Sequence, residues 1–285
     1  MNKFTRRTVI AAACAAAAMT FGPMSFAQQA PEKKDVTIAV GGKSLYYYLP
    51  LSIAEQLGYF KDEGLNVKIV DFQGGSRSLQ AVVGGSADVV SGAFEHTISM
   101  QAKKQPMTAF VLQGRAPQLA LVVSNKTMKD YKQLSDLKGK KVGVTAPGSS
   151  SQMVANFILK KGGLGPKDVA FIGVGSSSGA VSAIRSGQID ALINLDPVIT
   201  ILLKNGDAKL VADTRKVKES ESFFGGTMPA GCLYAPVSFI EKNPQTVQAL
   251  TNAIVRADEW LSKATPEEVA KVCLLYTSDA ADDRI

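Results

Sequence analysis

The sequence predicts an α/β protein built from two similar lobes with a ligand cleft between them. Short apolar segments typical of strands alternate with segments of helical periodicity, and the whole pattern occurs twice, with an offset near 102 residues. Glycine- and serine-rich turns follow the predicted strands in both copies. Because strands that alternate with helices form parallel sheets flanked by helices, each copy should fold as one lobe.

The first copy opens with a strand that a glycine-rich turn, Gly41 to Ser44, joins to a helix. In that helix Ile53 and Leu57 recur at helical spacing, and Pro50 stands in the first turn, where proline is tolerated. The predicted elements are a strand at 36–40, a helix at 50–57, a strand at 67–72, a helix at 78–83 and a strand at 89–91.

The second copy repeats this order. Residues 80–88 (QAVVGGSAD) and 182–190 (SAIRSGQID) share both spacing and character, which makes a chance similarity an unattractive explanation. The predicted elements are a strand at 141–145, a helix from the turn at 147–151 to about 160, a strand at 169–174, a helix that begins at 176–179 and a strand at 191–193.

The turns that end the predicted strands suggest where a ligand binds. In parallel sheets ligands bind beyond the carboxyl ends of the strands, where such turns lead into helices. The turns at Gly75-Ser76 and at 148–150 each offer backbone N–H groups, hydroxyls and the positive end of a helix dipole, which together suit an oxyanion. Serine and glycine also cap helices routinely, which is the alternative interpretation. Matched turns from two lobes favour a small anionic ligand in a shared cleft.

The amino-acid composition limits which classes of function are possible. Apolar residues make up 46% of the chain, and residues 28–272 suffice for one large domain or two modest ones, with no further apolar segment of membrane length. The formal net charge is +7, but the basic residues are spread along the chain in pairs such as Lys103-Lys104 and are not interleaved with aromatic residues. A groove for nucleic acid is therefore not indicated.

Cysteine and histidine are too few for most catalytic or metal sites. His96 is the only histidine, and Cys232 is the only cysteine between residues 28 and 272. Cys232 has no histidine near it in sequence and is expected to be a small buried apolar residue, while Glu95-His96 is typical of a helix start. We expect no catalytic residue, no metal and no cofactor.

The first 27 residues predict a secretory signal peptide. Lys3, Arg6 and Arg7 precede an apolar run at 9–18 that is too short to span a bilayer, and small residues at Ser25 and Ala27 offer a cleavage site. The expected location is therefore the periplasm, reached by the general secretory route or by the twin-arginine route, since Arg6-Arg7 loosely resembles a twin-arginine signal. The apolar run ahead of Cys14 is too brief for a lipoprotein signal.

The C-terminal residues 273–285 are predicted to be an artefact of sequencing. Residues 273–285 continue no helix or strand period, and residues 273–283, written back as codons, resemble the transposon-end adapter used to prepare sequencing libraries. The natural protein is then expected to be truncated near Val272, and residues 273–285 are not expected to belong to the fold. A genuine acidic tail is the alternative.

Five motifs carry a resemblance that spans nearly all of the chain after the signal peptide. They are residues 54–65 (AEQLGYFKDEGL), 84–88 (GGSAD), 137–144 (LKGKKVGV), 148–150 (GSS) and Asp196-Pro197. The chain resembles the periplasmic binding proteins of ABC importers for aliphatic sulfonates, taurine and nitrate, a family that also includes binders of thiamine-pyrimidine precursors.

This resemblance implies a type II periplasmic binding fold. Lobe 1 would comprise residues 35–116 and 230–272, and lobe 2 residues 117–229, with crossings near 114–119 and 228–231. The segment 236–272 would return to lobe 1 as helices, with Trp260 on the last. The implied partners are a small-molecule ligand and a membrane permease, and the protein is expected to be a monomer.

The resemblance also implies which residues line the pocket. The family often has an aromatic residue before the Asp-Pro pair, whereas this chain has Asn194-Leu195, so sulfonate specificity does not transfer directly. Tyr46 to Tyr48 could supply ring contacts or pack in the core. The implied ligand-binding residues are Gly42, Lys43, Ser44, Gly75, Ser76, Gly92, Phe94, Arg115, Ser149, Ser150 and Asp196.

The nature of the ligand depends on a basic group, with Lys43, Arg77 and Arg115 as the candidates. A basic group facing the serine turns would favour an anion, and an aromatic, uncharged cleft would favour a neutral heterocycle such as a pyrimidine precursor. Two other functions are compatible with the lobe pattern. An enzyme on the same fold, similar to sulfinate desulfinases or thiamine-pyrimidine synthases, requires a reactive cysteine or a histidine-rich iron site. A transcription regulator needs a DNA-binding unit where this chain has its signal peptide.

Overall fold

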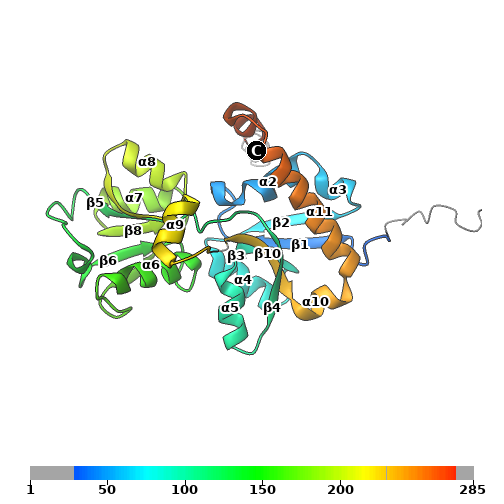
Figure 1. The fold of residues 1–285 in the computed structure, drawn as a ribbon, viewed down its shortest axis with the longest axis horizontal. Coiled ribbons are helices and arrows are strands. Elements are labelled where there is room, and N and C mark those ends of the chain that lie inside the picture. The colour runs from blue at the N-terminus through cyan, green and yellow to red at the C-terminus, as the bar shows by residue number, and fades with distance from the viewer. Residues whose placement is uncertain (1–28, 229, 274–285) are drawn as a thin grey trace, which may run out of the picture. The chain divides into compact units, whose positions relative to one another are not determined.

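Two five-stranded sheets organise residues 29–228 and 230–273, the part of the chain that the computed structural model describes (Figure 1). The first sheet has the strand order β2-β1-β3-β10-β4. In it β1 runs parallel to β2 and β3, while β10 pairs antiparallel with β3 and β4. Its strands are β1 (Asp35–Val40), β2 (Asn66–Asp71), β3 (Val89–Ala93), β4 (Met107–Leu112) and β10 (Gly231–Pro236).

The second sheet repeats this arrangement with the order β7-β6-β8-β5-β9. Here β6 runs parallel to β7 and β8, and β5 pairs antiparallel with β8 and β9. The predicted α/β class with a duplicated pattern is therefore confirmed. Its strands are β5 (Ala120–Ser124), β6 (Lys141–Val144), β7 (Ala170–Gly173), β8 (Ala191–Asn194) and β9 (Ala208–Asp213).

The chain passes from the first sheet to the second between β4 and β5, and returns between β9 and β10. The first passage covers residues 113–119, and the second covers residues 214–230 and includes α9 (Val217–Phe224). By their contacts, the described residues from Pro31 onward group into one compact unit. The lobe boundaries, residues 35–116 with 230–272 and residues 117–229, stay a prediction.

Helices follow the parallel strands as expected, with small shifts at their ends. The helix expected at 78–83 begins at Gly75, and the strand expected at 89–91 extends to Ala93. The helices of the first part are α2 (Leu49–Gln56), α3 (Tyr59–Asp62), α4 (Gly75–Val83) and α5 (Glu95–Ala102). Those that follow are α6 (Ser150–Lys161), α7 (Ser178–Ser186), α8 (Val198–Lys204), α9 (Val217–Phe224), α10 (Val237–Lys242) and α11 (Pro244–Leu261).

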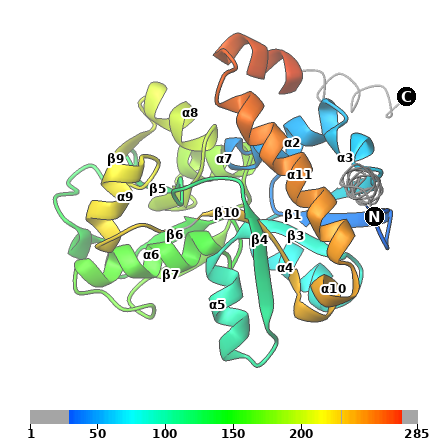
Figure 2. The ribbon, with the colours of Figure 1, turned by 45° about the vertical axis from the view of Figure 1, so that its right-hand side comes forward.

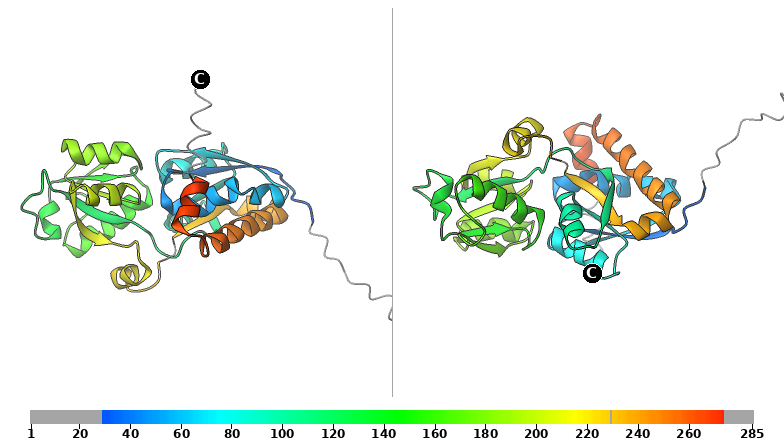
Figure 3. Two further views of the ribbon diagram at one scale, coloured as in Figure 1. Left: turned by 90° about the horizontal axis from the view of Figure 1, so that it is seen from above. Right: turned by 60° about the horizontal axis from the view of Figure 1, so that its bottom comes forward.

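The C-terminal segment returns to the first sheet as helices, as expected. Helix α11 buries Leu250, Ala253, Ile254 and Ala257 at helical spacing and packs on α2 and α3, beside which it lies in Figures 2 and 3. Trp260 lies on α11, and not on the last helix as expected, because a further helix covers residues 266–273.

Apolar side chains form three buried clusters. One belongs to the first sheet and contains Tyr234, and a second belongs to the second sheet and contains Ile184 and Leu192. The largest includes buried residues from both sheets. Tyr46 to Tyr48 form a 3₁₀ turn in which Tyr47 and Tyr48 are buried, while Tyr46 is 56% exposed.

The predicted signal peptide, residues 1–27, lies outside the described residues, as do all but Cys273 of the segment interpreted as an artefact. Among the residues that the structure describes, no helix combines the length and apolar character needed to cross a bilayer.

Candidate functional site

The serine turns of the two sheets meet each other. The Ser76 backbone N–H, in the first turn of α4, donates to Ser149 Oγ at 3.0 Å, and Ser149 Oγ donates to Ser76 Oγ at 3.2 Å. Ser76 Oγ in turn donates to the Pro147 carbonyl oxygen at 2.9 Å. The two turns expected to face one cleft therefore converge, and the first turns of α4 and α6 come together.

The neighbouring turns approach so closely that they require glycine. A Cβ on Gly42, which has a φ of +101°, would lie 2.3 Å from Ser176 Oγ in the turn after β7. A Cβ on Gly74 would lie 2.9 Å from the Ala146 Cβ in the turn after β6. A backbone bond adds to these contacts, since the Tyr46 N–H donates to the Asp196 carbonyl oxygen at 3.0 Å.

Side chains inside each sheet fix these turns. Asp71, at the end of β2, accepts hydrogen bonds from the N–H groups of Gly42 (2.8 Å) and Lys43 (2.9 Å). In the second sheet Ser151 Oγ accepts from the Thr145 N–H at 3.1 Å and contacts Thr145 Oγ1 at 2.9 Å. The turns are therefore held in shape by polar contacts within their own sheets.

Of the three candidate basic residues, Lys43 is held by an ion pair. Lys43 is only 7% exposed, and its ammonium group forms an ion pair with Glu55 of α2. Arg77 and Arg115 are exposed. Hydroxyls and a backbone N–H group make the hydrogen bonds that join the converging turns, and Arg77 follows Ser76 directly in the sequence.

Asp196 is held by its own neighbours. Its Oδ1 accepts from the Thr200 N–H (2.9 Å) and hydroxyl (2.7 Å), and its Oδ2 lies 3.3 Å from Arg215 Nη1. Arg215 also binds Asp213, the last residue of β9, at 2.7 Å. Burial acts to raise the pKa of Asp213, but the hydrogen bonds and charge of Arg215 hold that pKa below its ordinary value. The sequence analysis missed Arg215, whose nearness to Asp196 follows from the pairing of β9 with β5.

The remaining predicted site residues are scattered over different environments. Gly92 is buried in β3, where a Cβ would lie 3.1 Å from the Tyr234 ring. Phe94 is half-buried at the start of α5, and its N–H donates to the Ala230 carbonyl oxygen at 3.2 Å. Gly75 and Ser150 begin α4 and α6, whereas Ser44 is exposed.

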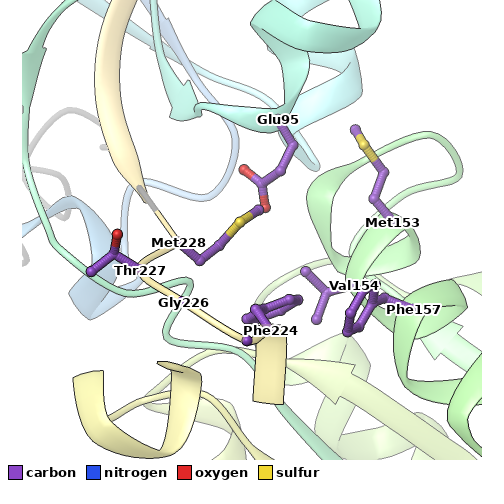
Figure 4. A pocket seen from close by; sticks show the side chains of 9 residues that line it. Glu95, Met153, Val154, Phe157, Phe224, Gly226, Thr227 and Met228 are labelled. Atoms are coloured by element: carbon purple, nitrogen blue, oxygen red, sulfur yellow. The ribbon is translucent and has the colours of Figure 1, made fainter. Parts of the chain in front are cut away.

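A pocket of about 370 Å³ adjoins the serine turns. Its walls come from α5, from α6 and from the end of α9 with the segment that returns to the first sheet, and they are mostly apolar (Figure 4). Glu95 is the ionisable residue among them and was missed as a site residue by the sequence analysis. The lining residues are Glu95, Met153, Val154, Phe157, Phe224, Gly225, Gly226, Thr227 and Met228.

His96 lies next to Glu95 and is buried. Its Nδ1 is 2.9 Å from the Tyr234 hydroxyl, and its Cε1 would lie 3.0 Å from a Cβ on Gly75. Burial lowers the pKa of His96 to about 4, so the ring is neutral at physiological pH. Glu95-His96 does begin a helix, as predicted.

Cys232 is fully buried in β10, as predicted, and burial raises the pKa of its thiol to about 12. A thiol with so high a pKa is protonated at neutral pH and is a poor nucleophile. The described residues contain no group of three His, Cys, Asp or Glu side chains placed to hold a metal ion.

Replacing Ser149 with alanine should lower the free energy of unfolding by about 1–2 kcal/mol, because the Ser76 N–H would lose its acceptor at a buried position. The neighbouring change Ser150→Ala is the matched control and should cost less than about 0.5 kcal/mol. Urea denaturation measures both. Equal stability of the two variants would contradict the contact between the turns.

Solved structures define the class of fold. The structure of a Bordetella bronchiseptica RB50 protein is 63% identical, with a TM-score of 0.85, over 86% of this chain and 77% of that one. The alkanesulfonate-binding protein SsuA of Xanthomonas axonopodis pv. citri, solved with bound MOPS, is 21% identical, with a TM-score of 0.67, over 85% of this chain and 80% of SsuA. The chain has the fold of periplasmic binding proteins.

A family model described as NMT1/THI5 like matches residues 46–269, and the chain belongs to this family. YtlA of Bacillus subtilis (strain 168), described as a candidate binding protein, is 25% identical over 272 residues, 94% of this chain and 78% of YtlA. The 4-amino-5-hydroxymethyl-2-methylpyrimidine phosphate synthase of Candida albicans (strain WO-1) is 24% identical over 233 residues, 79% of this chain and 67% of the synthase. The resemblance to binding proteins stated from the motifs is confirmed.

Proposed function

We propose that this chain is an extracytoplasmic solute-binding protein that captures a small solute and delivers it to the permease of an ABC importer. The observation that carries the proposal is the contact between Ser76 and Ser149, which brings helix starts from two separate sheets to one place. In α/β proteins, ligands bind at this edge of a sheet. The family and the fold support the same function.

The proposed mechanism is closure of two lobes about a hinge. Lobe 1 comprises residues 35–116 and 230–272, lobe 2 comprises residues 117–229, and the passages between the sheets form the hinge. A solute held beside the paired serine turns would bridge the lobes and stabilise the closed form, which then docks on the permease. In this proposal the protein acts as a monomer in the periplasm, and residues 1–27 direct its export.

The solute that the turns suit is a small oxyanion or an organic molecule that carries one, of the sulfonate, taurine or nitrate type. Backbone N–H groups and hydroxyls at two helix starts stabilise negative charge without a bound cation. The ion pair of Lys43 with Glu55 agrees with this mode, because Glu55 already neutralises the charge of Lys43. SsuA, which has this fold, is an alkanesulfonate-binding protein.

An enzyme is the second candidate, since a pyrimidine phosphate synthase is among the relatives. The protonated thiol of Cys232 and the buried, neutral His96 favour binding without chemistry. Cys232→Ser should therefore leave solute affinity unchanged. A turnover that the wild type shows and this variant lacks would favour the enzyme.

A thermal-shift screen tests the proposal with sulfonates, taurine, nitrate, aromatic acids and pyrimidines. A solute at 100 times its Kd should stabilise the protein by about 2.7 kcal/mol and raise Tm by several degrees. Ser149→Ala should reduce this shift, while Ser150→Ala should reduce it less. If no solute of any class raises Tm, the proposal fails.

A further inference from the structure

The pocket beside the serine turns contains a carboxyl group with one unpaired oxygen. Glu95 is 8% exposed, and its Oε2 is buried and accepts no hydrogen bond from any residue in 29–228 or 230–273. Figure 4 shows the carboxyl group directed from α5 toward Met228 and the ring of Phe224. A buried acceptor with no donor costs free energy, so such groups are few in folded proteins, and Glu95 Oε2 is the one that belongs to a carboxyl group lining this pocket.

The pocket walls leave this oxygen unpaired, since Thr227 has the only polar side chain among them besides Glu95 and its hydroxyl makes no hydrogen bond to Oε2. Met153, Val154 and Phe157 come from α6, and Phe224 and Met228 from the segment that returns to the first sheet. Their side chains are apolar. Their volume and character suit the body of a small organic molecule, since ligand pockets are mostly apolar with a few placed polar groups.

We propose that Glu95 is a specificity-determining residue of the solute site and that this pocket takes an apolar body ending in a nitrogen group rich in N–H donors, such as an amidinium or ammonium. The inference rests on the proposed function, because it places a second subsite next to the serine turns. The carboxylate would accept the N–H groups of the ligand, and the apolar walls would enclose its body. A charge-assisted hydrogen bond in a site of low polarity is strong and selective.

Two further features agree with this assignment. Burial raises the pKa of Glu95 to about 7, and a cationic ligand would favour the charged form. His96 follows Glu95 at the start of α5, and its ring lies against Gly75 at the start of α4. Glu95 is therefore linked through its neighbour His96 to the turn that carries Ser76. A ligand in the pocket would contact both α5 and α6, and so would bridge elements of the two sheets.

Isothermal titration calorimetry of the full chain at pH 7.5 tests the subsite with three probes that share a phenyl body: benzamidine, benzamide and benzoate. Benzamidine should bind best, and Glu95→Gln should weaken it at least about tenfold. Benzamide should change less than about threefold, and benzoate should bind the variant at least as well as the wild type. Glu259→Gln, the loss of an exposed carboxylate on α11, is the matched control and should leave all three affinities unchanged.

Equal binding of benzamidine to the wild type and to Glu95→Gln would overturn the assignment. So would a wild-type protein that binds benzoate better than benzamidine, or one that binds none of the three probes. The thermal-shift screen separates this failure from that of the proposed function. Stabilisation by an oxyanion without benzamidine binding would refute the subsite alone, whereas no response to any solute would refute both.

Discussion

Gly41→Ala should lower the free energy of unfolding by about 1–3 kcal/mol and abolish the response to solutes. Gly41 follows β1, and a Cβ there would lie 2.4 Å from both the Gly74 carbonyl carbon and the Gly75 nitrogen. These are backbone atoms, which cannot rotate aside as the end of a side chain can. The turn that carries Ser76 would have to move, and its hydrogen bonds to Ser149 would break. Urea denaturation and the thermal-shift screen measure the two effects.

Gly226→Ala is the matched control for stability. A Cβ on Gly226 would meet nothing within 4 Å, and the residue does not have a positive φ, so the expected change is below about 0.5 kcal/mol. If Gly41→Ala is as stable as this control and still responds to solutes, the close packing of the turns after β1 and β2 is refuted.

The repeat made most of the fold predictable. Parallel strands and the helices between them follow from local patterns, so β1, β2, β6 and β7 appear near their expected positions. The apolar run Ala120–Ser124 is also typical of a strand, but local pattern cannot show that it inserts between β8 and β9, because its partners lie some 70 to 90 residues further along the chain. Family resemblance, and not periodicity, predicted where the chain crosses.

The site was predictable in part, for the same reason. The pairing of Ser76 with Ser149 follows from placing each serine at the end of a parallel strand. The ion pair of Lys43 with Glu55 depends on how α2 packs, which no local pattern records. Glu95 lies two residues after β3, near the predicted site residue Phe94, but the burial of its unpaired Oε2 is a tertiary property.

Glu95→Gln should make the protein more stable than the wild type above neutral pH, by up to about 3 kcal/mol at pH 9. Burial in the pocket raises the pKa of Glu95 from 4.5 to about 7. The folded protein therefore holds this proton more tightly than the unfolded chain, and the wild type loses stability as the pH rises from 4.5 through about 7. Glutamine carries no charge at any pH, so the variant escapes this loss and differs little from the wild type below pH 4.5.

Other groups near Glu95 do not obscure this difference. Burial lowers the pKa of His96 to about 4, so its contribution has the opposite sign and is lost as the pH falls from 6.5 toward 4. His96 is present in both proteins, and its contribution therefore cancels in the comparison. Tyr47, Tyr234 and Cys232 stay protonated across the range, because burial and then the charge of Glu95 and its neighbours raise their pKa values.

Urea denaturation of the wild type, Glu95→Gln and Glu259→Gln between pH 4.5 and 9 measures this effect. The gap between Glu95→Gln and the wild type should open as the pH rises from 4.5 and level off above about 7, while Glu259→Gln should follow the wild type throughout. Benzamidine should close part of the gap at high pH, since it stabilises the charged carboxylate of the wild type and has no such partner in the variant. Parallel profiles for all three proteins would show that the Glu95 carboxyl group is solvated, and they would remove the reason for assigning it to a ligand.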